Sequence, residues 1–460
     1  MPGECSGGAQ LWAKGLPLDE AIHRFTVGED PQTDLVLVPF DALGSAAHAR
    51  MLASVGLLDM ADAKALVAEL KTIRDLARAG TFTITLEQED CHTAIEAHLT
   101  GRLGEAGRRI HLGRSRNDQV ILALRLYFRE SLLDLGDGIA GLAQAFLDFA
   151  AAHEHVRLPG YTHLRRAMPS SFGLWGAAFA EGLLEELEAL RALIRRLDKC
   201  PLGSAAGFGV PLALDRALTA ELLGFGAVQR SVVDVQNSRG RHELAILHWL
   251  SSVAFVLEKA LWDISLYTTE EFGFLALPDA FTTGSSIMPQ KRNPDVVELL
   301  RGRMGELRGL AHQVEQIAVG LPSNYHRDLQ LLKKPMLAAI ANGAEAFGIL
   351  AQVIAGLAVD AEKSGEACSD DLYAAQQAFE LVRQGLSFRE AYQVVGRQIQ
   401  SGDFAPNHEA PKAFHAGSSN DLGLDQTQAE LDGQRAWIQE KRSYWASKET
   451  ALFTFGETDD

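Results

Sequence analysis

Apolar residues recur at helical spacing over long stretches of the sequence. Each stretch places apolar residues alternately three and four positions apart, which makes one face of a long helix apolar. Such a face is normally buried against other, nearly parallel helices of a bundle. The pattern therefore predicts an all-α protein, and the predicted core positions are Leu132, Leu135, Ile139, Leu142, Phe146, Phe149, Leu183, Leu187, Leu190, Ile194, Leu197, Leu247, Leu250, Ala254, Leu257, Leu261 and Ile264.

Strand-like alternation is scarce, and its best short candidate is Thr81 to Thr85. Shorter helical stretches, including Asp62 to Arg78, precede the long ones, and the polar segment Asp360 to Asp371 follows them. A loop rich in Pro, Gly and Ser lies between Gly402 and Asn420. We therefore predict three helical domains: an N-terminal domain (1–108), a central bundle of long helices with a candidate catalytic loop (109–360) and a small C-terminal domain (361–460).

Charge and cysteine content narrow the functional classes. The formal net charge of -17 would repel a phosphate backbone, which argues against nucleic-acid binding. The cysteines are far apart in sequence and lack metal-ligand spacing, so we predict reduced thiols in a cytoplasmic protein; they are Cys5, Cys91, Cys200 and Cys368. Met1 to Gln10 has no signal-peptide pattern, and the longest uncharged apolar stretch, Leu244 to Leu257, is too short to span a bilayer. A soluble protein without membrane partners is expected.

A polar loop between Gly284 and Asp295 interrupts two strongly helical regions. Its small residues and proline predict a mobile loop. Asn293 and Pro294 then read as the N-cap and first residue of a helix that carries Glu298 near its first turn. A serine-rich loop that leads Lys291 to a helix N-terminus favours an anionic substrate. An ordinary turn between helices would have a similar composition.

The run Gly-Ser-Ser-Ile-Met-Pro-Gln-Lys-Arg-Asn, from Gly284 to Asn293, resembles the defining loop of the fumarase, aspartase, argininosuccinate lyase and adenylosuccinate lyase superfamily. The resemblance implies an all-helical fold with a central bundle, and a homotetramer whose active sites are each built from three chains. It also implies elimination of fumarate from a succinyl group, with Ser285 in proton transfer. A serine acts as a base only when nearby cations or a helix N-terminus lower its pKa.

A second block, His111 to Gln119, is similar to the His-Thr-Gly-Arg-Ser-Arg-Asn-Asp-Gln block of argininosuccinate lyases. It places Arg114, Arg116 and Asn117 just before a predicted helix. Arginine side chains bind carboxylates in bidentate fashion, and argininosuccinate carries several carboxylates. Leu112 stands where these relatives have a hydroxyl residue.

Further segments extend the resemblance from Leu11 to about Gly396. Gly160 to Leu164 matches a Gly-Tyr-Thr-His block, Leu321 to Gln330 resembles a substrate loop, and Phe388 matches the start of a tail helix. The substrate-binding positions that the resemblance implies are Asp34, Asp90, His92, Thr93, Arg116, Asn117, Thr162, Asn293, Tyr325, Gln330 and Lys333.

The implied reaction is the cofactor-free and metal-free β-elimination of fumarate from argininosuccinate, which yields L-arginine in arginine biosynthesis. Ser285 would remove the proton, while Lys291 and Asn293 stabilise the aci-carboxylate. His163 would help to protonate the leaving nitrogen, and Glu298 would orient His163 or Lys291. The acid and base roles could be reversed.

Two other functions stay open at this stage. One is adenylosuccinate lyase or another lyase of succinyl substrates, and the other is a structural relative that has lost catalysis, as in lens crystallins. A generic helical scaffold protein is the remaining alternative, but it would not need three polar blocks at helix ends. Departures from the family pattern bear on the substrate: Arg165 and Met168 replace glutamine, Lys334 replaces an acid, and the run 237–241 retains only Arg239.

Helix length predicts that active sites are shared between chains. A helix from about Asp118 to His153 would be roughly 50 Å long at 1.5 Å per residue. Arg116 precedes this helix and His163 follows it by about ten residues, a tether that reaches at most about 35 Å. One chain could not bring both onto a small substrate unless the helix breaks near Gly136.

Overall fold

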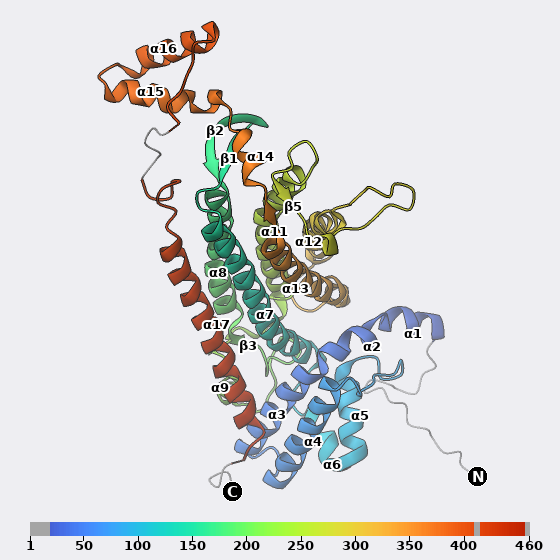
Figure 1. The fold of residues 1–460 in the computed structure, drawn as a ribbon. Helices are drawn as coiled ribbons and strands as arrows, with labels where there is room; N and C mark the ends of the chain where they lie inside the picture. Colours follow the sequence, from blue (N-terminus) through green and yellow to red (C-terminus); the bar gives the residue numbers. More distant parts are fainter. Residues whose placement is uncertain (1–18, 409–414, 456–460) are drawn as a thin grey trace, which may run out of the picture.

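The computed structural model describes residues 19–408 and 415–455, and most of these are helical (Figure 1). The expectations for Met1 to Gln10 and for Cys5 lie outside the described residues. Long helices form the centre of the molecule; they are α7 (Arg116–Ala152), α8 (Phe172–Leu197), α11 (Arg241–Tyr267), α12 (Asp295–Ala318) and α13 (Lys333–Gly356). Shorter elements connect them, namely α9 (Arg216–Leu222), α10 (Val232–Asn237), η3 (Asp279–Phe281) and η4 (Arg327–Leu332).

The predicted apolar stripes form the core of this central bundle. All 17 predicted core positions are buried, and they lie on α7, α8 and α11. α7 packs against α8 and α13, and α11 packs against α12 and α8. Gly176 of α8 permits one close approach, because a Cβ atom there would lie 3.0 Å from the carbonyl oxygen of Phe146 on α7. Each fully buried leucine contributes about 1.5–3 kcal/mol, so the stripes account for much of the bundle's stability.

α7 is a single unbroken helix that includes Gly136. Its N-cap, Ser115, forms a capping box with Asp118, whose carboxylate also accepts hydrogen bonds from the backbone of Gly203 and Ala205. The helix has 37 residues and is therefore about 55 Å long. The prediction of a shared site required that this helix does not break near Gly136, and this requirement is met.

The N-terminal part surrounds the buried helix α3 (Val38–Ser54), which packs against α4 (Met60–Arg78), α5 (Cys91–Leu103) and α7. Its other elements are α1 (Glu20–Val27), α2 (Asp30–Thr33), η1 (Asp34–Val36), α6 (Glu105–Arg108) and η2 (Arg109–His111). α3 is apolar or small on nearly every side and is buried from Val38 to Ala49, as expected for a helix enclosed by others. The predicted helix at 62–78 is confirmed by α4.

The strand prediction at Thr81 to Thr85 was wrong, since these residues form an irregular connection. The longest strands, β1 (Arg157–Thr162) and β2 (Arg165–Ser171), form an antiparallel hairpin instead. Two-residue pairings complete the strands: β3 (Lys199–Cys200) with β4 (Ala227–Val228), and β5 (Leu275–Ala276) with β6 (Ala358–Val359). Alternation of apolar side chains could not reveal the hairpin, because most of its residues are at least partly exposed.

The tail begins with α14 (Ala361–Glu366), η5 (Asp370–Tyr373), α15 (Ala374–Arg383) and α16 (Phe388–Ser401). α16 starts at the predicted Phe388, with a capping box between Ser387 and Glu390. α17 (Leu424–Leu452) leaves α15 and α16 and runs along α7 and α8 (Figure 1). Arg435 of α17 donates to Gln144 of α7, which fixes part of this contact. The three-domain division remains a prediction.

Two described segments, Val232–Tyr267 and Arg327–Gly356, are long and apolar enough to cross a membrane by composition alone. They contain α11 and α13, and about half of the most apolar window in each is buried (50% and 44%). Burial against neighbouring helices accounts for the apolar character of about half of each window.

Candidate active site

A cavity of about 100 Å³ lies where the N-terminal part meets the start of α7 and the segment from η4 to α13. It is lined by Asp30, Asp34, His92, Arg116, Asn117, Val120, Arg239, Tyr325, Arg327, Gln330 and Lys333. Seven of the predicted substrate-binding residues are in this set. Segments about 300 residues apart in the sequence thus form one polar cavity.

Lys333 is the best-fixed cation of the cavity. Its Nζ lies 2.7 Å from Asp30 Oδ2 and 2.6 Å from Asp34 Oδ1, and the side chain is buried. Burial disfavours the ammonium form, but Asp34 and Asp30 outweigh this effect and raise the pKa of Lys333. Burial raises the pKa of Asp30 to about 6 against the opposing effect of Lys333. Lys333 and Asp30 are therefore both charged at neutral pH, and one ammonium group contacts two carboxyl groups.

Arg116, the first residue of α7, connects the cavity to α5. Its guanidinium lies 3.0 Å from Glu89 and 3.2 Å from Asp90, and it donates to Thr93 Oγ1 at 2.7 Å. Asp90 is also the N-cap of α5. Burial opposes ionisation of Asp90, but His92 and Arg116 lower its pKa. Asp90 and Thr93 thus orient Arg116 from outside the cavity lining.

His92 contributes an imidazole whose two nitrogens face different surroundings. Nδ1 lies 2.9 Å from Asp41 Oδ2, and Nε2 has no hydrogen-bond partner among the described residues. Burial disfavours the imidazolium, but Asp41 outweighs it and raises the pKa of His92. His92 can therefore present a charged N–H donor at the cavity.

The loop with Tyr325 is held by the run whose sequence departs from the family pattern. Asn237 accepts a hydrogen bond from the backbone of Asn324 at 2.7 Å, and Arg239 donates to the carbonyl of Leu329 at 2.9 Å. Gln330 donates to the carbonyls of α1 at 2.9 and 3.2 Å. Two residues of the altered run thus position the cavity wall.

The loop from Gly284 to Asn293 projects away from the body of the molecule before α12 (Figure 1). Ser285 is half-buried, and its hydroxyl accepts hydrogen bonds from the backbone of the next turn at 3.2 and 3.3 Å. Asn293 pairs with Thr283 through backbone hydrogen bonds, and Pro294 is the N-cap of α12. The prediction that Asn293 caps the helix was therefore wrong by one residue, because the bridge to Thr283 holds its backbone in an extended pairing.

Thr162 and His163 lie at the tip of the β1–β2 hairpin, at the opposite end of the long helices from α5 (Figure 1). His163 and Leu164 both have positive φ, 53° and 56°, as in a tight two-residue turn. Both side chains are exposed, as are those of Lys291 and Glu298. The chain therefore does not bring His163 to the cavity that contains Arg116.

Possible metal ligands come together at one place in the described part of the chain. Asp41, Cys91 and His92 place their ligand atoms within 4.8 Å of one another. Burial and nearby carboxylates raise the pKa of the Cys91 thiol well above its usual value, so the thiolate that a metal needs is disfavoured. The hydrogen bond between Asp41 and His92 explains the proximity without a metal.

Comparison with known proteins identifies the family. The model of a lyase family matches residues 18–309. Argininosuccinate lyase of Sorangium cellulosum is 43% identical over 426 residues, which cover 92% of this chain and 98% of the relative. The corresponding enzyme of Stenotrophomonas maltophilia is 41% identical, with 91% and 98% covered. This chain belongs to the argininosuccinate lyase family.

Solved structures agree on the fold of the family. An EDDS lyase in complex with formate has a TM-score of 0.78 at 23% identity, with 95% of both chains covered. A fumarate lyase:delta crystallin from Brucella melitensis has a TM-score of 0.70 at 19% identity, with 92% and 96% covered. The mostly helical fold of this chain is thus consistent with the superfamily fold that the resemblance of the loop at Gly284 implied.

Three further side chains of this family member have positions that residue types alone did not indicate. Asp30 lines the cavity one helical turn before Asp34, a spacing that could have pointed to it. Arg114, in contrast, is buried and donates to Ser45 Oγ at 2.8 Å, so it does not face the cavity. Lys334 pairs with Glu29 at 2.8 Å on the exposed surface, away from the cavity lining.

Proposed function

We propose that this protein is an argininosuccinate lyase that cleaves argininosuccinate into L-arginine and fumarate, in the cytoplasm and without a cofactor. The curated relatives at 40–43% identity over most of the chain support the reaction. The single structural observation that carries it is the cavity at Lys333. There, cationic and amide donors and two carboxylates converge, as recognition of a substrate with both carboxylate and guanidinium groups requires.

In the proposed reaction, Ser285 removes a proton from the succinyl group. Lys291 and Asn293 stabilise the resulting aci-carboxylate, and His163 protonates the leaving nitrogen. Glu298 orients His163 or Lys291. The seven predicted substrate-binding residues that line the cavity hold the substrate, Asp90 and Thr93 act through Arg116, and Thr162 lies beside His163. The exchanged assignment, with His163 as base and Ser285 as acid, uses the same groups.

We further propose a homotetramer in which each active site combines the cavity of one chain with Ser285 and His163 of neighbouring chains. The length of α7, about 55 Å, supports this arrangement because it separates Arg116 from the hairpin. Exposed apolar side chains on the long helices offer surface for such contacts; examples are Phe255, Trp262 and Leu299.

The test is to incubate the purified protein with argininosuccinate and to follow fumarate by its ultraviolet absorbance, with adenylosuccinate in parallel. Release of fumarate from argininosuccinate alone would support the proposal. Release from adenylosuccinate alone would contradict it and would assign a different succinyl substrate. Release from neither would favour a non-catalytic relative.

A further inference from the structure

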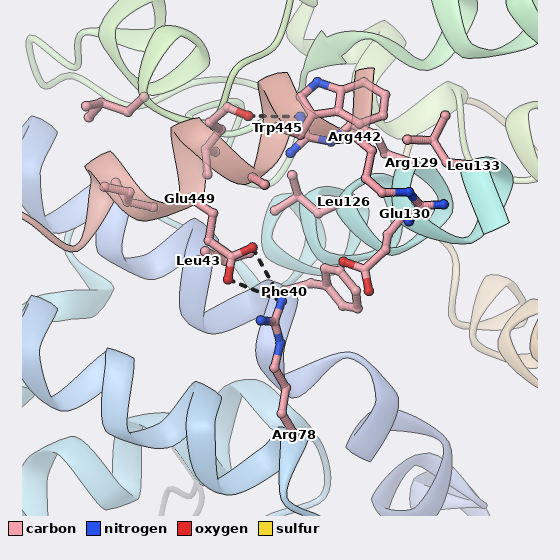
Figure 2. A pocket seen from close by; sticks show the side chains of 14 residues that line it. Phe40, Leu43, Arg78, Leu126, Arg129, Glu130, Leu133, Arg442, Trp445 and Glu449 are labelled. Atoms are coloured by element: carbon pink, nitrogen blue, oxygen red, sulfur yellow. Dashed lines mark hydrogen bonds and ion pairs between the residues drawn. The ribbon is translucent and has the colours of Figure 1, made fainter. Parts of the chain in front are cut away.

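A second cavity, of about 230 Å³, lies between α3, α4, α7, the end of α9 and α17 (Figure 2). It shares no lining residue with the cavity at Lys333. Most of its wall is apolar and includes Phe40, Leu126, Leu133 and Trp445. An apolar cavity of about 150 Å³ can bind benzene, so this one has room for an aromatic ring with a short substituent.

Arg129 is the polar group that distinguishes this cavity. Its guanidinium lies 4.4 Å from the ring centre of Trp445 and 5.1 Å from that of Phe225, and it donates to the Leu223 carbonyl at 2.9 Å. Burial lowers the pKa of Arg129 to about 10, which still leaves it charged at neutral pH. Within residues 19–408 and 415–455 Arg129 forms no ion pair with a carboxylate; Asp198 and Glu130 act on it as nearby charges that oppose the lowering of its pKa. Buried cations are normally paired, whereas Arg129 is held by two aromatic rings and a carbonyl without a directly bonded carboxylate.

The other two arginines of the wall are paired with carboxylates. Arg78 lies 3.2 Å from Glu449, and Arg442 pairs with two aspartates of α7 at 2.8 and 2.6 Å. Glu130 is largely exposed at the rim, and the partial burial of its carboxylate raises its pKa. An anion that enters the cavity would therefore meet Arg129 as the available cation.

We propose that this cavity is a second ligand site, which binds a small carboxylate with an aromatic body. The carboxylate pairs with Arg129 through charge-assisted hydrogen bonds, and the ring lies among Leu126, Leu133 and Trp445. The proposal does not depend on the lyase reaction, since no residue of the candidate active site lines this cavity.

Phenylacetate is a suitable probe, with binding to the full-length protein measured by isothermal titration calorimetry at low ionic strength. We expect a dissociation constant of about 1 mM or tighter. Phenylacetamide, its neutral analogue, should bind about ten- to a hundredfold more weakly, because it forms no charge-assisted bond with Arg129. Arg129→Met should remove the preference for the carboxylate.

Ala446→Phe, which fills the cavity from α17, should abolish binding while fumarate release from argininosuccinate stays unchanged. Ala429→Phe on the exposed surface of the same helix is the matched control and should bind normally. Three results would each overturn the proposal: no binding of phenylacetate up to about 10 mM, equal binding of phenylacetamide, or unchanged binding by Ala446→Phe. Displacement of phenylacetate by fumarate would also overturn it, by placing the probe in the active site.

Discussion

Two groups of candidate residues in this protein are held in opposite ways. Around the cavity, Asp34, His92 and Lys333 are buried and fixed by hydrogen bonds within one chain. On the loop and the hairpin, His163 and Lys291 are exposed. In the proposed function, substrate recognition is therefore preorganised by the chain itself. The proposed proton-transfer groups instead face outward, where a neighbouring chain and the substrate would complete their surroundings.

Ser285→Ala tests the outward-facing group with the largest expected effect. We expect kcat to fall by about a hundredfold to ten-thousandfold, the usual range for a positioned proton carrier. Thermal unfolding should be unchanged, because the hydroxyl accepts only two long hydrogen bonds within an exposed loop. Ser286→Ala, at the neighbouring exposed serine, is the control and should retain turnover. Turnover of Ser285→Ala near the wild-type value would remove Ser285 from the mechanism.

Mixed oligomers test whether the two regions meet between chains. His163→Ala and Asn117→Ala should each be nearly inactive, because each damages every site of its own oligomer. If one site takes these residues from different chains, co-refolding at equal amounts should restore about a quarter of wild-type activity by random assortment. The measurement is fumarate release before and after mixing, with each variant refolded alone as control. Activity no higher than the mean of the two variants would contradict a shared site.

The sequence predicted the bundle better than it predicted the surroundings of the site. The apolar stripe from Leu132 to Phe149 was enough to predict a helix there, because apolar residues at helical spacing form a local pattern that only a helix can bury on one face. The β1–β2 hairpin was missed because it is mostly exposed and its turn residues, His163 and Leu164, lack the usual Asn or Gly.

Pairings between distant segments could not be predicted from residue types alone. The ion pair of Lys333 with Asp30 joins positions 303 apart in the sequence. The ion pair of Arg116 with Glu89 likewise could not be predicted without knowledge of the fold. Family resemblance supplied Lys333, Arg116 and Gln330 as candidates. It could not supply Asp30, which is fixed by the particular geometry of α2 against α13.

Two lysine variants test whether the cavity contributes more to the free energy of unfolding than the exposed loop does. Lys333→Met should lower the free energy of unfolding by about 3–5 kcal/mol, because Asp30 and Asp34 would be left buried without a cation. Lys291→Met should change it by less than about 0.5 kcal/mol, since Lys291 is exposed. Both should lose lyase activity. Urea unfolding measures the difference, and Asp30→Asn added to Lys333→Met should recover part of the loss. Equal destabilisation by both substitutions would contradict the preorganised cavity.

The smallest expected effect concerns the charge state of His92. Its pKa is raised in the folded chain, so the folded state holds this proton to higher pH than the unfolded state, where the value is about 6.5. The stabilisation by the pair with Asp41 is therefore complete below that value and is lost as pH rises through the folded pKa. His92→Asn should lower the free energy of unfolding by about 1.5–3 kcal/mol near pH 6 and by less at alkaline pH.

His98→Asn is the control, since its pair with Glu69 is partly exposed and should contribute less. A loss for His92→Asn that does not vary with pH would mean that His92 and Asp41 share a neutral hydrogen bond, and His92 would then face the substrate without a charge.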